Sequence, residues 1–171
     1  PPQISLGKEQ HLTDLQTASQ NILAASRSIL IICQTIADCQ QIYQALTLTC
    51  KADDLILFAS EADNANLPKI ILPGKIIIAT NLAGRGTDLK TSPDLEANGG
   101  LHVIISFLPA NLRVQEQAMG RTSRSGNHGS GEMIINQDEA LAKYAPNEFG
   151  LGGLLPAELL INLRDKYEKL R

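Results

Sequence analysis

Two segments of the chain carry residues whose types and spacing suit phosphate chemistry. In the first, IIIATNLAGRGTDL (residues 76–89), an apolar run opens into a glycine-rich stretch with one cation and one anion. Glycines let the backbone approach a ligand closely, and such a loop after a strand suits a phosphate or ribose contact. A tight glycine turn with a local Arg–Asp pair would have the same composition. The residues predicted to bind a nucleotide here are Gly84, Arg85, Gly86, Thr87 and Asp88.

The second segment, QAMGRTSRSGNHG (residues 117–129), spaces an amide and two guanidinium groups at helical intervals. Gln117, Arg121 and Arg124 stand at i, i+4 and i+7, so they share one face if the helix persists. Arginine suits polyphosphate because its planar fork binds phosphate oxygens and keeps its charge. The segment therefore predicts a phosphate-facing catalytic set, although a solvated basic face is the alternative.

The elements that must position these segments follow from the hydrophobic pattern. Continuous apolar runs predict buried strands at 28–32, 55–58, 75–80, 101–107 and 132–136. Apolar stripes at helical spacing predict helices over 11–25, 36–48, 111–123 and 156–170, with Thr35 starting the second. We expect residues 1–9 to be loose and 60–74 to form a loop or short helix. Alternating strands and helices with apolar strands predict a doubly wound, three-layer α/β/α parallel sheet whose ligands lie at strand carboxyl ends.

Composition narrows the class of protein further. The chain has 171 residues, a net charge of −3 and 4% aromatic residues, so neither a basic surface nor a base-stacking platform for nucleic acid is indicated. No apolar run approaches the length of a membrane span. Three cysteines without a C-x-x-C pair and three scattered histidines predict no disulfide framework and no metal site. The cysteines and His102 are expected to be core residues.

The two segments, in this order, resemble motifs V and VI of the second RecA-like lobe of helicase-type motors. With GGLHVI at 99–104 between them, the pattern looks like SecA, the ATP-driven motor of bacterial protein export. The resemblance is densest over 76–129 and fades after about residue 136. Ser123 and Asn127 depart from the family pattern, which has Gly and Asp there. The resemblance also implies an acidic turn after the last strand, at Asp138 and Glu139.

The resemblance implies a role for each matching residue. Asp88 matches the motif V aspartate that contacts bound nucleotide, and Arg85 matches the motif V arginine between the lobes. Arg121 and Arg124 match the motif VI arginines, with Arg124 in the arginine-finger position near the γ-phosphate. Gln117 would help to organise the interface.

The chain has no G-x-x-x-x-G-K-[ST] phosphate-binding loop, so we expect ATP and Mg²⁺ to be held mainly by an N-terminal RecA-like lobe of a longer protein. Alone, the chain is expected not to turn over ATP. The SecA resemblance implies a polypeptide substrate, a membrane translocon as partner, and a cytoplasmic location with the membrane periphery as an alternative.

Two further expectations concern organisation and function. We divide the chain into a motor lobe at 1–150 and a helix at 151–171, which either packs on the lobe or begins an interdomain helix. The competing functions are an RNA or DNA helicase lobe and a divergent binding module that no longer hydrolyses ATP.

Overall fold

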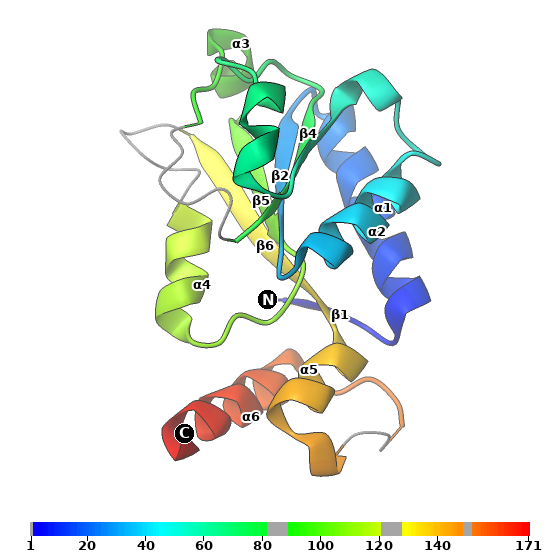
Figure 1. Ribbon diagram of the computed structural model, residues 1–171, viewed down its shortest axis with the longest axis vertical. Coiled ribbons are helices and arrows are strands. Elements are labelled where there is room, and N and C mark those ends of the chain that lie inside the picture. The colour runs from blue at the N-terminus through cyan, green and yellow to red at the C-terminus, as the bar shows by residue number, and fades with distance from the viewer. Residues whose placement is uncertain (1, 82–88, 121–127, 149–151) are drawn as a thin grey trace.

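The computed structural model describes residues 2–81, 89–120, 128–148 and 152–171, and these form one layered α/β lobe (Figure 1). Its sheet has six strands in the order β1-β6-β5-β2-β4-β3, and every neighbouring pair is parallel. The predicted α/β/α parallel fold is confirmed. The strands are β1 (Gln3–Ser5), β2 (Ser28–Cys33), β3 (Leu55–Phe58), β4 (Ile76–Thr80), β5 (Leu101–Ile105) and β6 (Gly129–Asn136).

The central strands are buried on both faces, which explains their unbroken apolar sequences. All residues of β2, β4 and β5 are buried. Ile31 of β2 stands between Ile78 of β4 and Ile104 of β5 in register. This central triplet fixes the sheet on which the two predicted segments depend.

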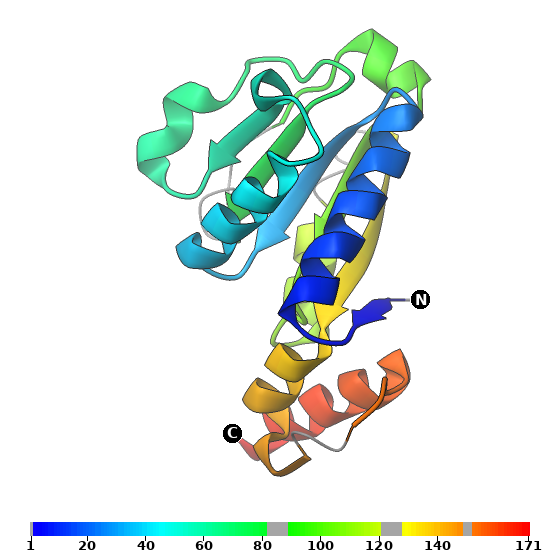
Figure 2. The same cartoon turned by 90° about the vertical axis from the view of Figure 1, so that its right-hand side faces the viewer.

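Helices cover the sheet on both sides. Helices α1 (Lys8–Ala24) and α2 (Ile36–Leu46) lie side by side on one face, where Figure 2 shows them in front of the strands. The opposite face carries α4 (Leu112–Met119), and the short α3 (Pro93–Ala97) lies beyond the amino-terminal ends of the strands (Figure 1), with Leu95 packed into the cluster on that side. Thr35 caps α2 by accepting a hydrogen bond from the Asp38 amide, 3.1 Å away, as the sequence predicts.

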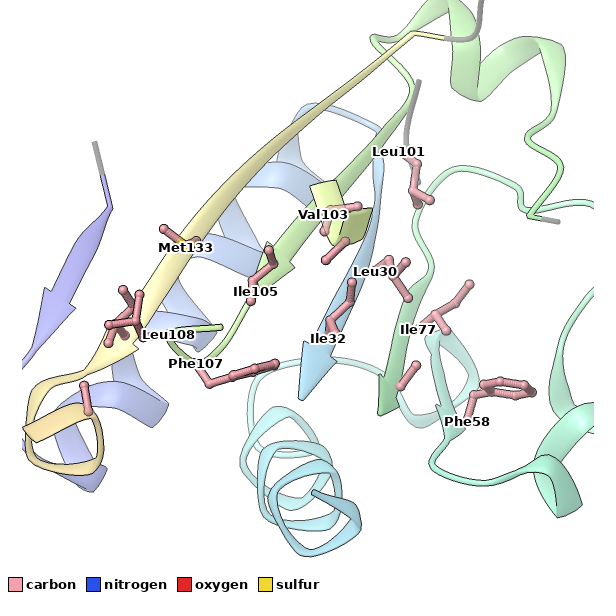
Figure 3. Close-up of a cluster of buried hydrophobic side chains, with 14 of the residues drawn as sticks. Leu30, Ile32, Phe58, Ile77, Leu101, Val103, Ile105, Phe107, Leu108 and Met133 are labelled. Atoms are coloured by element: carbon pink, nitrogen blue, oxygen red, sulfur yellow. The ribbon is translucent and has the colours of Figure 1, made fainter. Parts of the chain in front are cut away.

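Side chains alternate along the strands, so the sheet separates two hydrophobic clusters. Ile29, Ile31 and Ile78 point toward α1 and α2. Leu30, Ile32 and Ile77 belong to the other cluster, which Figure 3 shows extending from Phe58 to Met133. Both faces are therefore sealed by apolar contacts, and polar side chains are left to the strand ends and the connections.

The N-terminal residues were predicted wrongly as loose. Gln3–Ser5 form β1, which pairs with Ile134–Asn136 of β6, and α1 begins at Lys8 rather than at residue 11. The three-residue strand gives almost no apolar signal because its order comes from backbone pairing at the sheet edge. Gly7, with φ of 88°, turns the chain into α1.

Two helices lie below the carboxyl ends of the strands (Figure 1). Helix α5 (Gln137–Tyr144) occupies the position where an acidic turn was expected, and Asn136 caps it by accepting from the Asp138 amide. Helix α6 (Ala157–Leu170) follows and contributes Leu160 to the core. The rings of Tyr144 and Tyr167 meet edge to face, with centroids 5.4 Å apart. The proposed domain boundary lies at 149–151, outside the described residues, and stays a prediction.

Arg164 of α6 is buried, although it is a charged residue with charged neighbours on the same helix. Its side chain is only 1% exposed. Nη1 donates to the Pro109 carbonyl at 3.2 Å and to Oε1 of Gln115 at 3.1 Å, and Nε donates to Asp165 at 3.0 Å. A guanidinium can be buried here because it finds acceptors in three directions. One of them belongs to α4, so Arg164 ties α6 to the helix that precedes the second predicted segment.

Candidate functional site: the framework of two predicted nucleotide-binding segments

Most of the predicted site residues lie outside the described residues. These are Gly84, Arg85, Gly86, Thr87, Asp88, Arg121 and Arg124, together with Ser123 and Asn127. Gln117 is described, and it is exposed in the last turn of α4. The helix ends at Met119 with Gly120 as its C-cap, earlier than the predicted residue 123. The common face of Gln117, Arg121 and Arg124 therefore stays a prediction.

Asn81, where the apolar run of the first segment gives way to its glycine-rich stretch, lies at the carboxyl end of β4, as predicted. Thr80 donates from Oγ1 to the Ala59 carbonyl at 3.0 Å, beyond the end of β3. The Asn81 amide donates to the Cys33 carbonyl at 3.0 Å, at the end of β2. The chain thus enters the segment in register with both neighbouring strands.

Just after the first segment, the chain lies at the other end of the strands, where β4 begins. Thr91 forms an isolated parallel bridge with Ile71, before β4 begins. The Ile71 amide donates to the Lys90 carbonyl at 2.8 Å, and the Ser92 amide donates to the Ile71 carbonyl at 2.9 Å. The predicted ligand-binding residues between these two ends lie outside the described residues, so the expectation that ligands lie at strand carboxyl ends stays a prediction.

The downstream end of the second segment also lies at the amino-terminal ends of the strands. His128 immediately precedes β6, and its backbone packs against Gly100, which immediately precedes β5. A side-chain carbon on Gly100 would collide with the His128 carbonyl, and the φ of 79° at Gly100 also favours glycine. The Gly99–Gly100 pair of the GGLHVI motif thus has a structural reason.

Arg27 and His102 hold the start of β6 in place beside this contact. Arg27 donates from Nε to the Gly100 carbonyl at 3.0 Å and from Nη2 to Oγ of Ser130 at 2.7 Å. His102 lies 2.7 Å from Ser130 through Nδ1 and 2.6 Å from a Glu132 carboxylate oxygen through Nε2. His102 is buried with both ring nitrogens paired, as expected for a core histidine.

Met119 of α4 covers the same stretch of β6 near the upstream end of the second segment. Its sulfur lies close to where a side-chain carbon on Gly131 would stand, so a larger residue there would require the methionine side chain to move. Because Gly131 is three positions after His128, the second segment leaves and rejoins the fold at neighbouring positions on β6.

A separate polar pocket of about 240 Å³ opens near the N-termini of α1, α2 and α5. Its ionisable side chains are Lys8, His11, Asp38 and Glu139. Burial lowers the pKa of His11, whose Nε2 lies 2.9 Å from the Ile134 carbonyl, and desolvation followed by the Asp38 charge raises the pKa of Glu139. Two carboxylates beside one lysine make this pocket a poor site for a polyphosphate.

The described parts of the chain contain neither a cluster suited to bind a metal ion nor a cysteine pair with the features of a reactive thiol. No group of three or more His, Cys, Asp or Glu side chains in those parts could hold a metal ion. Cys33 and Cys39 are buried in the core, and a hydrogen bond with Cys39, together with burial, raises the pKa of the Cys33 thiol. Such thiols are inert core residues. None of the described helices is both long enough and apolar enough to cross a lipid bilayer.

The fold places the chain in a defined class. It is a RecA-like lobe of the kind found as the C-terminal lobe of helicases. The C-terminal domain of the DEAD-box protein Dbp5 matches 98% of this chain and 96% of its own length, with a TM-score of 0.53 and 14% identity. The E. coli DEAD-box protein SrmB matches 90% of this chain with 85% of that chain, a TM-score of 0.57 and 18% identity. Domain 2 of the DEAD-box helicase Mss116p, solved with an RNA duplex, matches 92% of this chain and 64% of its own, with a TM-score of 0.54 and 18% identity.

Within that class the sequence is SecA-like. Protein translocase subunit SecA 2 of Rhodopirellula baltica is 44% identical over 98 residues, which are 57% of this chain. SecA 3 of Magnetococcus marinus is 42% identical over 87 residues, or 50% of this chain, and SecA of Bacteroides fragilis is 33% identical over 128 residues, or 72%. No family model matches the chain. The chain spans only 11–13% of the length of these three relatives.

Proposed function

We propose that this chain is the second motor lobe of a SecA-like ATPase and completes an ATP site held mainly by another lobe. The observation that carries the proposal is the 42–44% identity to SecA subunits over half of the chain or more. The helicase-type fold supports it, because lobes of this class act in pairs around a nucleotide. The anchored ends of both segments supply the rigid base that such a site requires.

In this proposal the first segment contacts the bound nucleotide, and the second stabilises charge on its γ-phosphate. Asp88, with the Gly84–Thr87 backbone, contacts the bound nucleotide, and Arg85 lies at the interface between lobes. Arg124 neutralises charge that develops on the γ-phosphate, with Arg121 beside it and Gln117 organising the interface. Arginine fingers of this kind raise turnover by about 10³–10⁵-fold.

The partner lobe supplies what this chain lacks. The chain has no phosphate-binding loop of the G-x-x-x-x-G-K-[ST] type, so the other lobe of the full-length protein would hold ATP and its Mg²⁺. ATP would close the lobes and hydrolysis would release them. The SecA relatives are translocase subunits, so the proposed work is movement of a polypeptide at a membrane translocon, by a protein that is cytoplasmic or peripheral to the membrane.

A helicase lobe is the second candidate, and one specific observation favours it. The Mss116p domain of the same fold was solved with an RNA duplex. Against it, the net charge of −3 gives the chain no general attraction for a phosphate backbone. A lobe that binds without hydrolysis is the third candidate, supported by the departures at Ser123 and Asn127.

The experiment that separates these candidates measures ATP turnover by the full-length protein with an unfolded polypeptide or an RNA duplex added. We expect the polypeptide to stimulate turnover several-fold and the RNA to leave it unchanged. Stimulation by RNA that weakens steeply with salt would instead indicate a helicase. Absence of turnover under every condition would indicate a binding module.

A further inference from the structure

Glu96 joins the downstream ends of both predicted segments through one carboxylate. Its Oε1 accepts a hydrogen bond from Oγ1 of Thr91 at 2.7 Å, and its Oε2 accepts from the backbone amide of His128 at 3.0 Å. Thr91 stands two positions after the first segment (76–89), and His128 is the next-to-last residue of the second (117–129). The donors are 37 positions apart in the sequence, because 128 − 91 = 37. A single side chain therefore links the ends of two segments that the resemblance to helicase-type motors assigns to one nucleotide.

Both hydrogen-bond donors to Glu96 also make backbone contacts of their own. Thr91 is held on one side by its backbone bridge to Ile71. His128 is held on the other by its close backbone contact with Gly100. A carboxylate between two anchored donors sets their relative position, whereas between two loose donors it would only follow them.

Glu96 is itself well placed within α3. Ser92 caps this short helix by accepting from the Leu95 amide at 3.1 Å, and Leu95 is fully buried. The Gly99 amide donates to the Glu96 carbonyl at 3.1 Å, so the helix continues directly into the Gly99–Gly100 turn. The carboxylate is therefore attached to the same short unit that forms the contact with His128.

We propose that Glu96 is a positioning residue that couples Thr91 to His128, so that the chain leaving the first segment and the chain leaving the second are held together rather than independently. The catalytic consequence of this inference rests on the proposed function. The hydrogen-bonded link between Thr91, Glu96 and His128 does not depend on that function. It assigns a role to a residue that lies outside both motifs and would not contact the nucleotide.

The structural part is tested by hydrogen exchange on the 171-residue chain. We expect Glu96→Ala to accelerate exchange of the His128 amide at least tenfold and to accelerate exchange in 82–91 and 121–127 together. Thr91→Val should also accelerate exchange at His128, although less, because Glu96 links the two positions. Asp94→Ala is the matched control, since Asp94 is an exposed carboxylate on the same helix. Unchanged exchange at His128 in Glu96→Ala, or no effect there of Thr91→Val, overturns the coupling.

Glu96→Gln separates hydrogen bonding from charge. Its amide oxygen can accept from the His128 amide while its NH₂ donates to the Thr91 hydroxyl, so both contacts can survive without a charge. We expect exchange within about threefold of the unaltered chain, since the contacts rather than the charge do the positioning. Exchange as fast as in Glu96→Ala would contradict positioning by these two hydrogen bonds.

The catalytic consequence is tested in the full-length protein. We expect Glu96→Ala to lower kcat about tenfold with little change in the Kd for ATP, and Glu96→Gln to restore most of the loss. An unchanged kcat in Glu96→Ala, when Arg124→Ala abolishes turnover, overturns the positioning role and leaves the proposed function standing. Turnover unaffected by Arg124→Ala overturns the proposed function, whereas the exchange result at His128 decides the coupling separately.

Discussion

Gly100 and the carbonyl of His128 approach so closely that no side-chain carbon fits between them. The contact joins the turn before β5 to the residue before β6, at the point where the second segment rejoins the sheet. It is formed by backbone atoms on both sides and cannot be relieved by rotating a side chain. The position of His128 at the end of the second segment therefore depends on a glycine that would not itself contact a ligand.

Gly100→Ala is expected to destabilise the lobe by about 3 kcal/mol or more, because left-handed strain and a backbone collision act together. The control is Gly74→Ala, at φ of 89° with nothing within 4 Å of the added carbon. There only the strain remains, about 1–2 kcal/mol. Urea denaturation of both variants measures the difference, and equal losses would rule out the contact as its cause.

Arg164→Ala is expected to lower the free energy of unfolding by about 2–4 kcal/mol. The substitution leaves the Pro109 carbonyl and the Gln115 amide oxygen without their donor and removes a buried side chain. Lys166→Ala, on the exposed side of the same helix, should have no measurable effect on the urea midpoint. If the two variants unfold alike, α6 is not held by Arg164.

The stability of the chain should fall as the pH drops below the ordinary histidine pKa of about 6.5, because burial lowers the pKa of His11 in the folded state. In that window the unfolded chain binds a proton at this position that the folded chain does not. Above it both states are neutral and the effect vanishes. His11→Gln keeps a donor for the Ile134 carbonyl but cannot bind the proton. Its free energy of unfolding, measured by urea denaturation at several pH values between about 7 and 5.5, should therefore fall less steeply as the pH is lowered. An unchanged slope would assign the pH dependence to other groups.

The 171-residue chain by itself is expected to release no phosphate from ATP above the buffer background, because it contains no phosphate-binding loop. A phosphate-release assay with added Mg²⁺ checks this. Turnover that disappears in an Arg121→Ala/Arg124→Ala double variant would show that the chain hydrolyses ATP without a second lobe.

Sequence reasoning predicted the parts of the fold whose signal is local. The run SILII gave β2 to within one residue, and Thr35 with Asp38 correctly marked the start of α2. These features depend on burial of consecutive side chains or on a hydrogen bond within one turn. Strand β1 has no such signal, because only its pairing with β6 orders it.

The framework around the candidate site was harder to predict for the same reason. Arg164 looks like any charged residue beside an apolar stripe, and its acceptors lie at Pro109 and Gln115, far away in the sequence. Glu96 likewise bonds to a backbone amide at residue 128, which no motif indicates. The glycines of GGLHVI did carry a signal, since two adjacent glycines before a buried strand mark a special turn.

The most direct test of the central claim is a single-turnover measurement of ATP hydrolysis by the full-length protein and its Arg124→Ala variant. Arg171→Ala is the control, because its side chain is exposed at the far end of α6. We predict that Arg124→Ala slows the chemical step by about 10³-fold or more while ATP still binds, and that the control is unaffected. Equal rates of hydrolysis in Arg124→Ala and the unaltered protein would contradict the account.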